Sequence, residues 1–120
     1  QTAVRYWGRM AHHGFGGIAL DEAEGNRIAD AQRDDPHADI FFLDHHGVTV
    51  GGESIAVAFD DLYYLERASR QQVLAQSTGL PLKIMPDEIV QTTYRQMEQL
   101  RVQSAALHFK ALLHKHSLNS

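Results

Sequence analysis

Histidines beside a glycine turn are the residues of this chain best suited to chemistry. The segment Asp44-His45-His46-Gly47 follows the apolar run Asp39–Leu43, and a second apolar run begins at Val48. This pattern predicts a strand, a glycine turn and a returning strand, with histidine at the carboxyl end of the first strand. The glycine would let a metal or a substrate approach the backbone closely. Such a histidine suits a divalent metal ion, although a lone strand-end histidine is more often structural.

Only one of the two adjacent histidines can serve a given site. Neighbouring residues on a strand point to opposite faces of the sheet, so we expect His46 and His45 not to chelate one ion together. A second pair, His12-His13, could join His46 in a metal site or could be solvated in a loop. A third group, His114-Lys115-His116, stands at the end of the last predicted helix.

Three other groups have both a chemical and a structural interpretation. Tyr63 and Tyr64 could supply a phenol for proton transfer, or could pack in a core or an interface. Asp60 and Asp61 form an acidic pair, but consecutive helical residues diverge by about 100°, so we expect them on a solvated face. The glycines between residues 14 and 17 favour a turn over a phosphate loop, because no helix starts close behind them.

Composition excludes several classes of protein. A chain of 120 residues, 43% hydrophobic and 22% charged, fits one globular domain at most. A formal net charge of −4 argues against a nucleic-acid partner. The sequence contains no apolar stretch long enough to span a membrane, and the segment after Gln1 lacks the apolar core of a signal peptide. The absence of cysteine excludes disulfides and thiolate ligands, and fits a cytoplasmic location.

The local signals predict a mixed α/β order of elements. Asp21 and Glu24 match a capping box, and Gly79 with Pro81 is a typical helix stop. The predicted elements are a loop with a short strand near residues 18–20, a helix over 21–33, a strand pair within 39–51, and helices over 54–77 and 86–116. Three helices with two or three strands would leave sheet edges bare, so the chain looks like part of a larger domain.

The long helix over residues 54–77 carries an apolar stripe. Phe59, Leu62 and Leu65 recur at steps of three residues, and we expect them to be buried against the sheet that carries Phe41 and Leu43. If Phe59 is fully buried, its replacement by alanine should cost about 3–5 kcal/mol.

The succession of these motifs resembles the class II aldolase/adducin family. The similarity runs through residues 21–25, then Ile40–Leu43 leading into His46-Gly47-Val48, then Ala58-Phe59 and Tyr64-Leu65-Glu66. It covers roughly residues 1–82 and corresponds to the carboxyl-terminal half of the family's domain. The resemblance implies an α/β fold in which residues 1–120 form the carboxyl-terminal portion of a three-layer αβα domain. The amino-terminal half of that domain would be absent.

The resemblance implies a metal-dependent lyase. The family's third metal ligand falls on His46, and the other two come from an upstream His-x-His pair that this chain lacks. A divalent metal, with zinc the first expectation, would act as a Lewis acid while a carbon–carbon bond breaks in a small hydroxy-carbonyl or carboxylate substrate. The family also implies a homotetramer completed by the missing half. The alternatives are a sugar-phosphate epimerase and a non-catalytic, adducin-like assembly module.

Overall fold

The computed structural model describes residues 1–14 and 22–116, which belong to two compact units. One unit is Gly8–Gly52, and the other combines Gln1–Trp7 with the chain from Glu53 onward. The expected strand near residues 18–20, the glycines at 16 and 17, and the cap at Asp21 lie outside the described residues. None of the described helices has the length and hydropathy required to cross a membrane.

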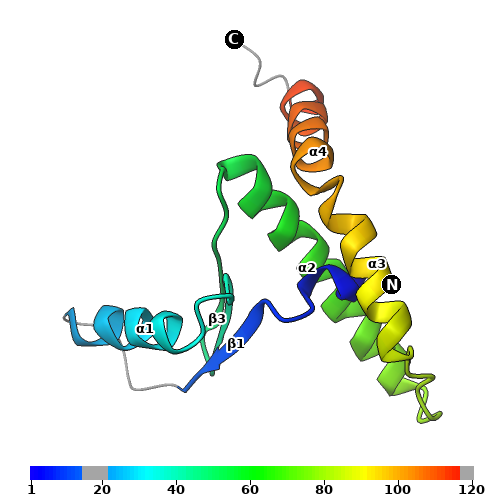
Figure 1. Ribbon diagram of the computed structural model, residues 1–120, viewed down its shortest axis with the longest axis horizontal. Helices are drawn as coiled ribbons and strands as arrows, with labels where there is room; N and C mark the ends of the chain where they lie inside the picture. The colour runs from blue at the N-terminus through cyan, green and yellow to red at the C-terminus, as the bar shows by residue number, and fades with distance from the viewer. Residues whose placement is uncertain (15–21, 117–120) are drawn as a thin grey trace. The chain divides into compact units, whose positions relative to one another are not determined.

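A three-stranded sheet and one helix make up the unit Gly8–Gly52 (Figure 1). The strands are β1 (Met10–His13), β2 (Ile40–Leu43) and β3 (Gly47–Val50), in the spatial order β1-β2-β3. Strand β1 is parallel to β2, and β2 is antiparallel to β3. Helix α1 (Glu22–Asp34) lies in the connection from β1 to β2, as a parallel pair requires.

The structure confirms two of the sequence predictions for this unit and corrects a third. The strand pair within residues 39–51 and the helix ending near Arg33 are present. Strand β1 lies where a loop was predicted. The prediction missed it because Met10–His13 contains no β-branched residue to mark a strand. Its ladder with β2 is formed between segments thirty residues apart, and this pairing leaves no local signal.

An arginine–aspartate pair joins the beginnings of β1 and β2. The Arg9 guanidinium donates from Nε and Nη2 to the two Asp39 carboxylate oxygens, at 3.0 and 2.6 Å. The Arg9 carbonyl accepts the N–H groups of Asp39 and Ile40, and the Asp39 carbonyl accepts the Gly51 N–H. Arg9 is buried, so this bidentate pair holds residues 9 and 39 side by side at the start of the ladder. Each strand then runs for four residues, and β1 and β2 therefore end side by side.

Four helices form the second unit. They are the 3₁₀ helix η1 (Thr2–Tyr6) and the α-helices α2 (Ile55–Ser77), α3 (Asp87–Glu98) and α4 (Arg101–Lys115). In Figure 1 the yellow α3 and the orange α4 form a bent rod beside the green α2. Helix α4 packs on α2, whereas α3 packs mainly on η1. The mixed α/β class expected from the sequence is therefore confirmed.

The predicted boundaries of α2 are confirmed. Ser54 caps the helix, because its Oγ accepts the Val57 N–H at 3.2 Å. The helix ends at Ser77, and Gly79 has a φ of 69°, in the left-handed region that glycine adopts without strain.

The single helix predicted over residues 86–116 is wrong, because the chain forms two helices there. The Leu100 N–H bonds to the Met97 carbonyl three residues back, and this interrupts the α-helical pattern. No proline or glycine marks this break in the sequence. The two halves pack on different elements, α3 on η1 and α4 on α2, and this difference accounts for the bend between them.

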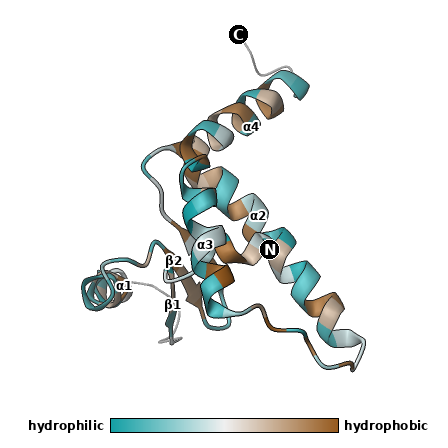
Figure 2. Cartoon of the chain, turned by 45° about the vertical axis from the view of Figure 1, so that its right-hand side comes forward, coloured by the Kyte–Doolittle hydropathy of each residue, from teal (hydrophilic) through white to brown (hydrophobic). Residues whose placement is uncertain are grey.

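The buried face of α2 also differs from the prediction. Asp60 and Asp61 are only 2% and 0% exposed, whereas Phe59 and Leu62 are 38% and 44% exposed. Leu65 alone of the expected stripe is buried. Figure 2 shows hydrophobic residues in brown along α2 and along the segment that follows it. The buried face of α2 therefore combines the two aspartates with Leu65, while Phe59 and Leu62 lie at its exposed margin.

Replacement of Phe59 by alanine should accordingly cost less than the sequence suggests. Its ring meets Phe109 edge to face, with centroids 5.8 Å apart, but more than a third of the residue is exposed. We expect a loss of about 1–2 kcal/mol in urea unfolding, against about 2–5 kcal/mol for Leu65→Ala at the buried position. An equal loss for the two variants would show that Phe59 is covered in solution.

Candidate functional site

The turn between β2 and β3 carries the predicted metal ligand. Strand β2 ends at Leu43, so His45 and His46 lie in the turn and not on the strand. The His46 N–H donates to the Leu43 carbonyl at 3.0 Å and closes the turn. His45 has a φ of 58° and Gly47 a φ of 153°. Positive φ values are strained for most residues and free of strain for glycine, so Gly47 suits its position.

Strand alternation does not separate the two histidines, contrary to the expectation. Both are exposed, and they differ in backbone conformation instead. The His46 imidazole makes no hydrogen bond, ion pair or ring contact with any residue that the structure describes. A Cβ added at Gly47 would meet nothing within 4 Å. The backbone at Gly47 is therefore open, among the described residues, on the side where a side chain would lie.

A second histidine pair ends the neighbouring strand. His12 and His13 are not a loop pair, because they are the last residues of β1. The Asp44 N–H donates to the His13 carbonyl at 3.0 Å, and the His12 ring stacks on Phe42 with centroids 5.3 Å apart. The carboxyl ends of β1 and β2 thus lie together, at the kind of sheet edge where α/β proteins bind ligands.

The histidines at this edge do not form a complete metal centre. Among residues 1–14 and 22–116, no three His, Asp or Glu side chains converge in a way that could hold a metal ion. The His-x-His group near residue 115 belongs to the other compact unit, with His114 exposed on the last turn of α4 and His116 exposed at its C-cap.

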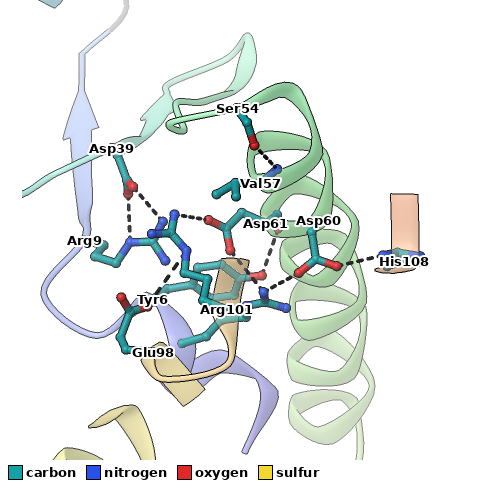
Figure 3. A network of polar contacts seen from close by, with 11 residues as sticks. Tyr6, Arg9, Asp39, Ser54, Val57, Asp60, Asp61, Glu98, Arg101 and His108 are labelled. Carbon is teal, nitrogen blue, oxygen red and sulfur yellow. Dashed lines mark hydrogen bonds and ion pairs between the residues drawn. The ribbon is translucent and has the colours of Figure 1, made fainter. Parts of the chain in front are cut away.

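Two buried aspartates on α2 organise a charged cluster in the helical unit (Figure 3). The Asp60 carboxylate accepts Arg5 Nη2 at 2.5 Å and His108 Nδ1 at 2.7 Å. The Asp61 carboxylate accepts Arg101 Nη2 at 2.7 Å and lies 3.3 Å from Arg5 Nη2. Because an ionised carboxylate can only accept, His108 carries its proton on Nδ1 in this contact. The cluster thus links η1, α2 and α4.

Aromatic rings surround the cluster. The Arg5 guanidinium lies over the Tyr64 ring, 4.7 Å from its centroid, and the His108 ring meets Tyr63 at 4.8 Å. The structural interpretation of the two tyrosines fits this packing. Both belong to a different compact unit from the histidine turn.

Sequence reasoning missed Arg5, Arg101 and His108 as partners of the acidic pair. One signal was present, because Asp60 and Asp61 interrupt the apolar residues of a long helix between Phe59 and Leu62. Acids in such a setting are either solvated or paired with cations from elsewhere. Their pairing residues lie 40 to 55 positions away in the sequence. Local sequence signals therefore could not show whether the two aspartates are solvated or paired.

Comparison with known proteins points to one family. The family model of the Class II Aldolase and Adducin N-terminal domain matches residues 3–73. A provisionally named aldolase class 2 protein from Pseudomonas aeruginosa is 35% identical over 81 residues, which cover 68% of this chain and 30% of the relative. Another from Caulobacter vibrioides is 32% identical over 87 residues, covering 72% of this chain and 33% of the relative.

A solved structure agrees with this fold. The crystal structure of an aldolase II superfamily protein from Pseudomonas syringae is 32% identical, with a TM-score of 0.81. The match covers 95% of this chain and 45% of that protein. The chain thus spans about a third of the length of the curated relatives that it matches. The expectation that residues 1–120 correspond to the carboxyl-terminal half of the domain stays a prediction.

Proposed function

This chain belongs to the class II aldolase and adducin family, and from that premise we propose that it supplies one metal ligand, His46, to a metal-dependent lyase. The proposed reaction is cleavage of a carbon–carbon bond in a small hydroxy-carbonyl or carboxylate compound, of the aldolase or decarboxylase type. The single observation that carries the proposal is the exposed, unbonded imidazole of His46 beside Gly47, at the carboxyl edge of the sheet.

The residues present fit a metal ion as one part of its ligand set. An imidazole nitrogen binds zinc well and binds manganese, cobalt or iron less selectively, so zinc is the first candidate. The bound ion would supply Lewis acidity, which stabilises the negative charge left when a carbon–carbon bond breaks. Gly47 would leave room for a substrate beside the ion, because it has no side chain to fill that space.

The remaining ligands are expected from another part of the protein. A catalytic zinc usually has three protein ligands and one open position, and this chain contributes one of the three under the proposal. We place the other two on an upstream His-x-His pair, as the family resemblance implies. The complete protein would be a cytoplasmic homotetramer with sites near subunit interfaces.

The second candidate function is a non-catalytic assembly module of the adducin type. Exposed apolar residues on α2 favour it, since Ile55 is 76% exposed and Leu62 is 44% exposed. An imidazole beside a glycine turn brings no advantage to such a module, and for this reason we prefer the lyase. An epimerase remains an option within the same metal chemistry.

Metal analysis of the intact protein distinguishes these functions. We expect the purified full-length protein to contain stoichiometric divalent metal, and chelation to abolish carbon–carbon bond cleavage until the metal is restored. An adducin-like module would contain no bound metal and would keep its oligomeric state after chelation. Metal without cleavage but with inversion of a hydroxyl-bearing carbon would select the epimerase.

A further inference from the structure

A pocket of about 390 Å³ lies within the helical unit, beside the charged cluster. Its wall is formed by η1, α2, α3 and α4, so every lining residue belongs to this one unit. The volume falls in the range of small-molecule sites, roughly 300–1,000 Å³. The family match ends at residue 73, whereas the part of the wall from α3 and α4 lies beyond it. None of the residues that line the pocket belongs to the histidine turn.

The charged groups on the pocket wall pair with one another. The wall contains Arg5 and Arg101 as cations, Asp60 and Glu98 as anions, and His108, whose Nδ1 bonds to Asp60. Arg5 pairs with Asp60 at 2.5 Å, and Arg101 Nε lies 3.9 Å from Glu98. A charged ligand would compete with these existing ion pairs, whereas an uncharged ligand would leave them intact. The wall thus favours an uncharged ligand over an anion or a cation.

The polar groups on the wall include both donors and acceptors. Guanidinium groups only donate and carboxylates only accept, while Thr93, Gln96 and Ser104 can do both. A hydroxyl group is itself a donor and an acceptor, so it can bond to neighbouring groups of either kind. The Met97 and Leu100 side chains add apolar surface against which a carbon skeleton can pack.

We infer that this pocket binds a small uncharged polyhydroxy compound. The buried carboxylates Asp60 and Asp61 hold the two guanidiniums and His108 in place beside the ligand. This role is independent of the metal chemistry proposed for His46, because no residue of the turn takes part in it.

Methionine methyl NMR on the full-length protein tests the inference. Met97 lines the pocket, whereas Met10 in β1 and Met85 before α3 do not, so they serve as internal controls. We expect xylitol to shift the Met97 methyl signal saturably and to leave Met10 and Met85 unchanged. Malonate and putrescine, as an anion and a cation of similar size, should not shift the Met97 signal.

Matched substitutions on α4 locate the binding. Ser104→Phe places a ring in the pocket, while Gln103→Phe places the same ring on the exposed helix surface outside it. We expect Ser104→Phe to weaken xylitol binding at least tenfold and Gln103→Phe to leave it unchanged. Unchanged binding in Ser104→Phe, or a saturable response to malonate or putrescine alone, would overturn the inference. A linear, parallel drift of all three methyl signals would also overturn it, as a solvent effect of an adventitious additive only.

Discussion

Replacing His46 with alanine is expected to strip the metal from the full-length protein and to abolish its lyase activity. Loss of a hydrogen-bond partner behind a metal ligand typically lowers metal affinity by about 10–100-fold. Loss of the ligand itself should exceed that, since two remaining ligands hold a catalytic metal poorly. Metal content after gel filtration, together with a carbon–carbon cleavage assay, measures both effects.

The matched control is His45→Asn. His45 has a φ of 58°, and asparagine tolerates this left-handed conformation better than alanine does, so the turn should keep its shape. This variant should retain the metal and the activity. If His46→Ala keeps stoichiometric metal, the ligand assignment fails. If both variants lose the metal, the turn as a whole matters and His46 has no specific role.

Replacing Asp61 with alanine is expected to destabilise the protein by about 3–5 kcal/mol. Asp61 is fully buried, and its carboxylate accepts Arg101 at 2.7 Å and lies 3.3 Å from Arg5. Its removal would leave the partly buried Arg101 guanidinium without its nearest carboxylate, whereas Arg5 would keep Asp60, and the lost counter-charge at Arg101 makes the destabilisation large. Urea unfolding of the variant and the parent, followed by far-UV circular dichroism, measures the difference.

Asp30→Ala is the matched control for this prediction. Asp30 pairs with Arg33 on α1, but both side chains are more than half exposed. Exposed ion pairs contribute only about 0–1 kcal/mol, so a small loss is expected. In a double-mutant cycle, Asp61→Ala with Arg101→Met should cost clearly less than the sum of the single changes. A loss below about 1 kcal/mol for Asp61→Ala would place this carboxylate in water.

The helix α2 shows how far local signals reach. Ser54 as its cap and Gly79 as its stop are correct predictions, because a cap and a stop act on backbone groups within a few residues. The prediction of its buried face is wrong, because the most apolar side of a helix is buried only if another element covers that side. Here Arg5 and Arg101 neutralise the two aspartates, and the helices that carry them cover the acidic face.

The candidate metal turn also has some features that local sequence predicts and others that only the fold decides. The histidine at position 46 and the glycine after it indicate a candidate ligand, because imidazole chemistry and glycine conformations are properties of single residues, and the family resemblance is what selects His46. The backbone of the turn is not predictable in this detail, and the strand ends three residues before His46. The approach of His12 and His13 also depends on a parallel pairing that the chain reaches only through α1.

The sequence by itself determined the helices α1 and α2, the strand pair β2–β3, the family and the candidate ligand. Each of these depends on caps, breakers, periodicity or a short motif, all of which act within a few residues. Only the tertiary structure decided the pairing of β1 with β2, the break between α3 and α4, and the burial of Asp60 and Asp61. Those features depend on contacts such as that between Arg5 and Asp60, which are 55 positions apart and become neighbours only when the chain folds.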